Sequence, residues 1–268
     1  MAKCLLIGFV FLVALGAALL FGALRYEETN FVVSGPADVE TIVTISPGAP
    51  LRRIANQLED AGVLEDATLF RLGVMRREAA TDLKAGEYRI PANASMARLL
   101  EMLRNHEAIQ HRITVAEGLT TSMALAIVQA DPILSGEIED VPPEGSLLPE
   151  TYLFERGTTR QQIIDRMRRA QEDLLVELWP SRNPDLPFDT LEDAIILASI
   201  VEKETGLADE RPTVASVFVN RLRIGMRLES DPTIIYGLTG GEPLGRGLRV
   251  SEIEAPNPYS TYQIDRLP

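Results

Sequence analysis

The sequence predicts an α+β protein built from a single N-terminal transmembrane helix, a small strand–helix–helix–strand unit and a larger helix-rich α+β domain. Three observations predict this class. Residues 4–24 form an uncharged apolar run, residues 41–110 place two alternating strand patterns around helical periodicity, and residues 111–268 are mainly helical with turn-rich segments between. The chain has 268 residues, 46% of them apolar, which is enough to fill a core.

Composition excludes several classes of function. The chain carries 26 basic and 39 acidic residues, a formal net charge of −13, which disfavours nucleic acid as a partner. The only cysteine is Cys4 and the only histidines are His106 and His111, so a disulfide framework and a thiolate metal site are excluded. We expect no metal and no cofactor.

The apolar run, CLLIGFVFLVALGAALLFGAL at 4–24, is long enough to cross a bilayer core of about 30 Å. Lys3 precedes the run, and Arg25 after it is followed at once by Glu27 and Glu28, so the positive-inside rule favours a cytoplasmic N-terminus. Residues 1–24 would then be the cytoplasmic end and anchor, with the rest outside the cytoplasm. A cleaved signal peptide is the alternative.

Residues 25–40 are polar and lack helical periodicity, which predicts a linker. The small unit follows at 41–110. TIVTIS (41–46) reads as a half-buried strand, and helical spacing begins at Leu51. Later signals continue the unit: a helix capped by Asp66, a strand after Gly86, a helix capped by Ser95, and a strand at 111–118 leading onward.

The strand–helix–helix–strand order is also that of LysM-like carbohydrate-binding modules. Many small α+β units share it, and order alone does not fix function. Glycan binding by residues 41–110 is therefore one reading among several.

The larger domain, 111–268, starts with turn-rich segments at 142–145 and 148–152. Helical signals return at 158–178, a loop covers 179–187, and Thr190 caps a helix that ends in SIVEKETG (199–206). Two shorter helices should follow, the first capped by Asp209 with Pro212 in its first turn, the second opened by Asp231-Pro232 and ended by Gly237.

SIVEKETG raises the question of which glutamate is chemically active. At 100° per residue, Leu197, Ile200 and Val201 fall within about 60° of Glu204, whereas Glu202 points about 160° away. The two carboxylates do not face each other. Glu204 shares the apolar face, so we expect it to be shielded from water.

Shielding, and a place in the last turn before the expected cap Gly206, both favour the protonated carboxyl group that a general acid needs. The alternative is a structural role, in which Glu204 reaches solvent past the helix end or pairs with Arg211 or Arg221.

The stretch ILASIVEKETGLADERPTVASVFVNRLRIGMRLESDPTIIYGL (196–238) closely resembles the core of the YceG-like (MltG) family of membrane-anchored endolytic murein transglycosylases. EGSLLPETYLF (144–154) is similar to the family's EG-x-L-x-PDTY segment. With the small unit and the anchor, the resemblance covers nearly the whole chain. It implies that Glu204, in the Glu-Thr dipeptide, is the catalytic acid.

The resemblance implies a lyase that cleaves the β-1,4 bond between N-acetylmuramic acid and N-acetylglucosamine. Glu204 would protonate the glycosidic oxygen and then take the proton of the muramyl 6-hydroxyl, which closes a 1,6-anhydro ring. Unlike two-carboxylate glycosidases, such an enzyme needs no second carboxylate. It would end the growth of nascent strands.

By resemblance, five further residues line the cleft and bind sugar: Glu150, Tyr152, Asn220, Asp231 and Tyr236. Each has a structural alternative: Asp231 as a helix cap, the tyrosines as half-buried core, Asn220 as a loop anchor. Arg221 is expected to pair with an acidic neighbour.

This chain departs from the family pattern in three places. Glu150 replaces an Asp, and PYSTY (258–262) has Ser260 where PYNTY has Asn. The family usually continues past the position of Pro268 through a GLPPxPI-like stretch, so we expect the C-terminal part of the catalytic domain to be missing.

The resemblance also implies a single-pass protein of the inner (plasma) membrane with a periplasmic, extracytoplasmic catalytic domain. Its partners would be peptidoglycan strands, and it would work beside cell-wall synthases and division proteins. Two alternatives remain. One is an inactive, membrane-anchored peptidoglycan-binding protein; the other is a muramidase-type hydrolase that pairs Glu204 with Glu202 or Asp231.

Overall fold

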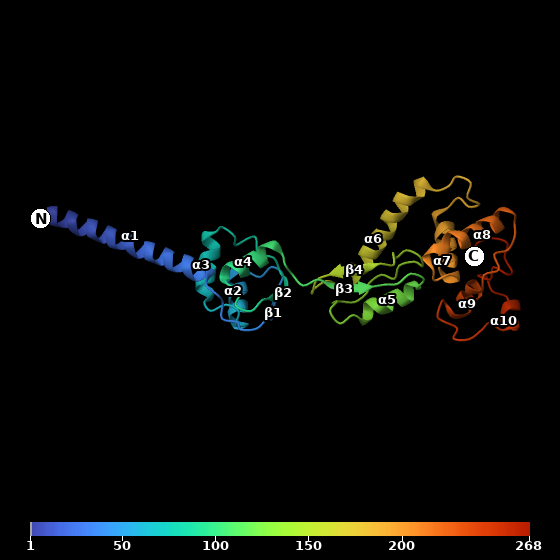
Figure 1. Ribbon diagram of the computed structural model, residues 1–268, viewed down its shortest axis with the longest axis horizontal. Helices are drawn as coiled ribbons and strands as arrows, with labels where there is room; N and C mark the ends of the chain where they lie inside the picture. The colour runs from blue at the N-terminus through green and yellow to red at the C-terminus, as the bar shows by residue number, and fades with distance from the viewer. Residues whose placement is uncertain (1) are drawn as a thin grey trace. The chain divides into compact units, whose positions relative to one another are not determined.

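The computed structural model describes residues 2–268; Met1, where the predicted cytoplasmic end begins, lies outside the described residues. The chain forms two compact units (Figure 1). The first runs to His111 and includes the strap 154–157, and the second contains 112–153 and 158–268. A four-residue piece of the later chain therefore folds with the first unit.

The first unit joins one long helix to a small α+β body. Its elements are α1 (Ala2–Val32), β1 (Thr41–Ile45), α2 (Leu51–Asp60), α3 (Ala67–Arg76), β2 (Gly86–Ile90) and α4 (Met96–Asn105). Strands β1 and β2 pair antiparallel, with Thr41 opposite Ile90 and Ile45 opposite Gly86. The strand–helix–helix–strand order agrees with the sequence prediction, while the relation to LysM modules stays a prediction.

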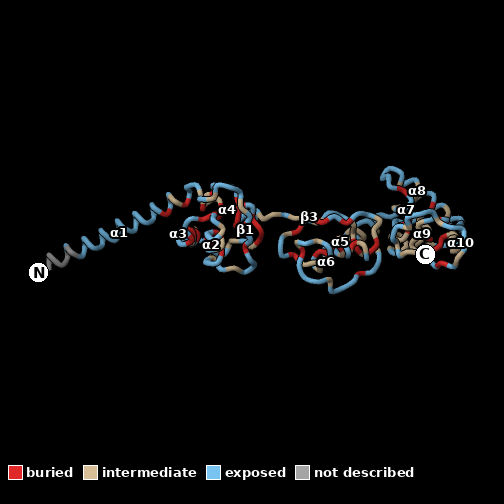
Figure 2. Tube along the Cα trace, turned by 90° about the horizontal axis from the view of Figure 1, so that it is seen from below, coloured by how far each residue is buried: buried red, intermediate tan, exposed pale blue. Residues whose placement is uncertain are grey.

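Local capping explains where these helices begin. The Asp66 side chain accepts hydrogen bonds from the backbone of Thr68 and Leu69, and Ser95 accepts one from Arg98, as predicted. The apolar faces then close on one core, visible as the buried part of the unit in Figure 2. Its most enclosed large side chains include Phe31, Ile45, Leu58, Phe70, Tyr88 and Leu99.

The prediction of a non-helical linker is wrong for residues 25–32, because α1 continues to Val32. Two side chains in this stretch are buried against the small body: Glu27 is 6% and Phe31 1% exposed. The sequence of this last part of α1 is mainly polar because only one side of the helix packs against the small body. Upstream, α1 is long and apolar enough to cross a membrane.

The second unit holds the remaining elements, apart from His111 of β3 and Phe154 of β4, which belong to the first unit. These elements are β3 (His111–Thr114), α5 (Thr121–Ala130), β4 (Thr151–Phe154), α6 (Arg160–Leu178), α7 (Leu191–Glu204), α8 (Arg211–Arg223), α9 (Asp231–Thr239) and α10 (Val250–Glu254). Short 3-10 turns follow α6 and precede α8. Strands β3 and β4 form a two-stranded sheet.

Several predicted ends of these helices are confirmed and several are wrong. Thr190 caps α7 as predicted. Asp209 does not cap α8, because a 3-10 turn places Glu210 at that position. Gly206 is not the αL residue after α7, since the helix ends at an extended Thr205. Helix α9 passes through Gly237.

Candidate active site

Helix α7 ends at Glu204, and the apolar face predicted beside it is buried: Leu197, Ile200 and Val201 are each 5–7% exposed. Glu204 itself is exposed, so the expectation that it is shielded is wrong. Glu204 is on the same side of α7 as these residues, but the apolar core ends one turn before the helix does. The Glu204 side chain therefore lies at the end of α7, beyond the apolar core.

Glu202 has the structural role. Its carboxylate pairs with Arg211, with 2.9 Å between Oε2 and Nε. Arg221, the other expected partner for Glu204, instead pairs with Glu229 at 3.7 Å. Both arginines are therefore engaged by other carboxylates, and the predicted partner role of Arg221 is confirmed.

Thr205 fixes the turn that follows the catalytic candidate. It is 7% exposed, and its hydroxyl donates to Glu210 Oε2 at 2.7 Å. Thr205 Oγ1 also accepts the backbone N–H of Leu207 at 3.1 Å. The chain thus turns directly after Glu204 and holds its backbone in place while leaving the carboxyl group open.

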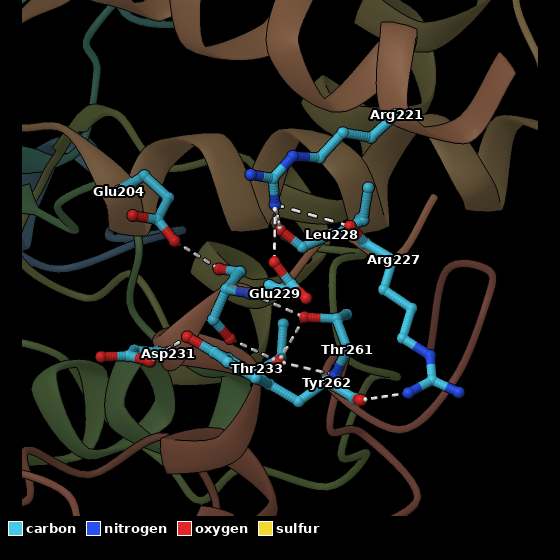
Figure 3. A network of polar contacts seen from close by, with 10 residues as sticks. Glu204, Arg221, Arg227, Leu228, Glu229, Asp231, Thr233, Thr261 and Tyr262 are labelled. Carbon is cyan, nitrogen blue, oxygen red and sulfur yellow. Dashed lines mark hydrogen bonds and ion pairs between the residues drawn. The ribbon is translucent and has the colours of Figure 1, made fainter. Parts of the chain in front are cut away.

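The Glu204 side chain is held by one hydroxyl group. Ser230 Oγ donates to Glu204 Oε1 at 2.5 Å (Figure 3). Ser230 is 1% exposed, and its own backbone N–H donates to Thr261 Oγ1 at 2.9 Å. Thr233 completes the cluster by donating to the Ser230 carbonyl at 2.7 Å and accepting the Thr261 N–H at 3.1 Å. Buried polar groups that are all paired hold one arrangement.

Asp231 follows Ser230 directly and opens α9, with Ser230 rather than Asp231 at the cap position. Its Oδ1 accepts a hydrogen bond from the Tyr262 hydroxyl at 2.9 Å (Figure 3). Burial raises the pKa of Tyr262, and the bond to Asp231 together with the charges of Asp231, Glu229 and Glu204 raises it further. The phenol therefore stays protonated and remains a hydrogen-bond donor at neutral pH.

Tyr236 lies half-buried on α9 and meets Tyr259 edge to face, with 4.9 Å between ring centroids. Gly237 allows α9 to pack closely against Asn257, because a Cβ at this position would lie 2.0 Å from the Asn257 side chain. Asn257 donates to the Ile234 carbonyl at 3.2 Å, which fastens the 257–263 segment to α9. Gly237 thus serves close packing and not the end of a helix.

The predicted turn-rich motif reaches the same region through its first residues. Burial raises the pKa of Tyr236, and the charge of Glu144 adds to this. Glu144 Oε1 also accepts the Thr121 N–H at 2.7 Å, at the start of α5. A Cβ on Gly145 would lie 2.8 Å from Ile195 of α7. The motif therefore contacts the start of α5 and packs against α7, the helix that ends at Glu204.

The other three predicted residues make local contacts. Glu150 accepts the N–H of Thr151 at 2.7 Å, and Asn220 accepts from Arg223 at 3.2 Å; both are exposed. Tyr152 donates to the Leu148 carbonyl at 2.8 Å, and burial followed by the charge of Glu150 raises its pKa to about 12. No hydrogen bond of Glu150, Tyr152 or Asn220 among residues 2–268 reaches Glu204.

Sequence reasoning missed the hydroxyl residues that hold Glu204. Ser230 and Thr261 are 31 positions apart, and neither is close to Glu204 in sequence. One signal was present: DPT at 231–233 and STY at 260–262 put small hydroxyl residues into both stretches matched to the family. Contact between the two stretches required the tertiary fold.

The arrangement suits proton transfer at a single carboxyl group. One oxygen of Glu204 is fixed by the Ser230 hydroxyl. Among residues 2–268 the other oxygen has no hydrogen-bond partner, so it can hold or accept a proton. Within the described part of the chain, no three His, Cys, Asp or Glu side chains are grouped as metal ligands. Proton transfer by Glu204 is the chemistry that these residues offer.

Fold and site together define a class: an α+β protein with one N-terminal apolar helix, whose second unit presents one exposed, hydroxyl-anchored glutamate at a helix end. The profile of the YceG-like family matches residues 43–268. The chain belongs to the YceG-like family.

Two relatives show how far the similarity extends. A protein of Streptococcus pneumoniae serotype 2 (strain D39) named endolytic murein transglycosylase is 26% identical over 310 residues, which cover 97% of this chain and 55% of the relative. A Bacillus subtilis (strain 168) protein of the same name is 26% identical over 282 residues, covering 93% and 75%. The chain thus spans about half the length of the pneumococcal relative.

Among solved structures, a yceG-like protein from Listeria monocytogenes is similar at 25% sequence identity, with 85% of this chain and 84% of that chain covered and a TM-score of 0.46.

Proposed function

We propose that this chain is an endolytic peptidoglycan lytic transglycosylase in which Glu204 is the single acid and base. The observation that carries the proposal is the Glu204 carboxyl group, exposed at the end of α7 with one oxygen held by Ser230 at 2.5 Å. Membership of the YceG-like family, and the name that its relatives bear, supply the substrate class.

The reaction follows from the two oxygens of Glu204. Protonated on Oε2, it donates to the glycosidic oxygen as the bond from muramyl C1 to that oxygen breaks and C1 becomes oxocarbenium-like. The resulting carboxylate removes the proton from the muramyl 6-hydroxyl, whose oxygen bonds to C1 and closes the anhydro ring. The Ser230 hydroxyl can donate to Oε1 in both states, because a carboxylate oxygen and a carboxylic carbonyl oxygen both accept.

The proposed cleft residues divide into two groups. Asp231 and Tyr236 lie on α9 beside the Glu204 network and would bind sugar hydroxyls and the apolar face of a ring. Glu150, Tyr152 and Asn220 contact their own segments and would act through the shape of their loops or at more distant sugar units. No metal or cofactor enters any step.

The proposed location follows from α1, whose apolar part would anchor the chain by a single pass in the plasma membrane. With Lys3 on the cytoplasmic side, both units would lie outside the cytoplasm, where peptidoglycan is assembled. Cell-wall synthases and division proteins are then the expected neighbours.

The decisive experiment is digestion of purified peptidoglycan by the full chain, with mass spectrometry of the products. We expect 1,6-anhydro-muramyl ends, and none from Glu204→Gln. Free reducing ends that disappear in Asp231→Asn would instead identify a hydrolase, for which the position of Asp231 next to Ser230 is the supporting observation. Binding without cleavage would identify an inactive peptidoglycan-binding protein.

A further inference from the structure

Helix α1 is fastened rigidly to the body of the first unit. Glu27 Oε1 and Oε2 pair with Arg77 and Arg76 at 2.7 and 2.8 Å, and the ring of Phe31 stacks on Phe70 with centroids 6.1 Å apart. A Cβ on Gly73 would lie 2.2 Å from Phe31, so α1 and α3 approach as closely as a glycine permits. The body therefore follows the orientation of α1.

The attachment lies next to the end of the apolar run. Leu24 is its last residue, and Glu27 is three residues later, about 4.5 Å along the helix axis. The headgroup layer on each side of a bilayer core is about 6 Å thick or more. The exposed Tyr26, 64% accessible, has the chemistry of an interfacial side chain. When α1 crosses a bilayer, the ion pairs of Glu27 are level with the lipid headgroups.

Helix α3 is the part of the body nearest that surface. In Figures 1 and 2 it lies on the side of the unit from which α1 arrives, whereas β1 lies on the side farther from α1. Its outward face carries two large apolar side chains that are about half exposed, Leu72 at 52% and Met75 at 48%. Arg71 and Arg76 flank them on the same helical face.

We propose that α3 lies on the outer surface of the bilayer, with Leu72 and Met75 inserted at the boundary between headgroups and acyl chains. Apolar side chains flanked by arginines are the pattern of helices that lie in this layer. Arg71 can bind lipid phosphate, whereas Arg76 is already paired with Glu27. Glu27 does not oppose this, because Arg76 and Arg77 neutralise it, and Glu28 is 3.7 Å from Arg25. Glu65, Asp66 and Glu78 at the two ends of α3 are also exposed, so insertion of Leu72 and Met75, and not net charge, holds α3 at the surface. The lipid surface thus fixes the first unit as well as α1.

The test uses the full chain in vesicles of phosphatidylcholine and phosphatidylglycerol. Cys4 is replaced by alanine, and one fluorophore is attached at Leu72→Cys. The matched control is Ile42→Cys on β1, because Ile42 and Leu72 are both 52% exposed. We expect the label at 72 to be quenched by spin-labelled lipid and about threefold less by aqueous iodide than the label at 42, given a burial depth of about 5–10 Å.

Three outcomes would overturn the proposal. Equal iodide quenching at 72 and 42 would place α3 in water. Protection from iodide without quenching by spin-labelled lipid would mean that protein, such as a second copy of the chain, covers this face. A reference label at Leu15→Cys that iodide reaches would show that α1 does not span the bilayer.

The proposal is independent of the chemistry at Glu204. Quenching at position 72 should be unchanged in Glu204→Gln, so membrane contact and peptidoglycan cleavage can each fail alone.

Discussion

The buried carboxylates of the first unit and Glu204 of the second unit have opposite surroundings. In the first unit, Glu27 and Glu87 are 6% and 7% exposed, and each has two basic partners: Arg76 and Arg77 for Glu27, His111 and Arg156 for Glu87. In the second unit, Glu204 is exposed and its side-chain bond is to one neutral hydroxyl group. A buried carboxylate must be neutralised to be tolerated, whereas an exposed one can stay free for proton transfer.

This contrast indicates which of these glutamates have a structural role. It also distinguishes Glu202 from its neighbour, since Glu202 is half-buried and paired with Arg211. Substitution of the paired glutamates should therefore change stability, whereas substitution of Glu204 should change activity.

The largest expected effect is on catalysis. Glu204→Gln keeps the shape and the Ser230 contact but cannot transfer protons, so kcat for peptidoglycan cleavage should fall by about 10²–10⁴-fold. Thermal stability should not change, because the side chain is exposed. Glu202→Gln is the matched control on the same helix and should retain cleavage. Full activity of Glu204→Gln would contradict the proposal that Glu204 is the catalytic acid.

The next effect is on stability and lies in the first unit. Glu27→Gln leaves Arg76 and Arg77 without a carboxylate, although water reaches about a third of each arginine side chain. We expect the contact between α1 and α3 to weaken by about 2 kcal/mol, below the range for fully buried pairs. Hydrogen exchange of a peptide covering 67–77 should then be about 30-fold faster.

The control for this prediction is Glu40→Gln. Glu40 pairs with Arg89 at the same distance of 2.8 Å, but the two side chains are 53% and 57% exposed. Exposed pairs contribute about 1 kcal/mol or less, so exchange should change little. Equal changes in both variants would contradict the distinction between buried and exposed pairs.

A smaller effect on activity is expected at Ser230, as a positioning residue. Ser230→Ala removes the donor that fixes Glu204 Oε1, so the carboxyl group would sample several orientations. A hydrogen bond to a charged group contributes about 1.5 kcal/mol or more, which predicts a decrease in kcat of about tenfold with KM unchanged. Ser216→Ala on the exposed side of α8 is the control. A rise in KM at constant kcat would assign Ser230 to substrate binding instead.

The smallest effect is the pH dependence of the first unit. Burial alone would raise the pKa of Glu87, but hydrogen bonds from His111 and Arg156, with their charges, outweigh it and lower the pKa below 4.5. A carboxyl group whose pKa is lowered on folding stabilises the fold at pH values above its pKa in the unfolded chain. This stabilisation is lost as the pH falls below about 4.5 towards the pKa of the folded state.

We therefore expect the urea concentration at which the first unit is half unfolded to decrease below about pH 4.5. Hydrogen exchange of β2 would monitor this unfolding. Glu87→Gln should be less stable at pH 7 and should show a flatter dependence. The groups that face Glu87 are His111 from β3 and Arg156 from the strap. An unchanged acid slope in Glu87→Gln would assign the effect to other carboxylates.

Much of the secondary structure could be predicted because its signals are local. Asp66, Ser95 and Thr190 cap their helices as expected, since a cap binds backbone groups two or three residues away. Helix α5 and strand β4 were not predicted. Strand β4 is four residues long and pairs with β3, almost forty residues earlier, so its own sequence carried only a turn signal.

The candidate site was predicted in part. Angular periodicity correctly separated Glu202 from Glu204, but it could not show where the core ends along α7, so the exposure of Glu204 was missed. The extension of α1 was missed for a related reason. A helix that is covered on one side over only two turns has too few apolar residues to show periodicity.

By itself, the sequence determined the apolar α1, the order of the small unit, the caps Asp66, Ser95 and Thr190, and the different faces of Glu202 and Glu204, because each depends on residues close together in the chain. Only the tertiary structure decided what surrounds that glutamate. Ser230, Thr233 and Thr261 meet through hydrogen bonds between separate segments, and such contacts exist only once the chain has closed on itself. The same holds for the attachment of α1 to α3, which joins residues about fifty positions apart.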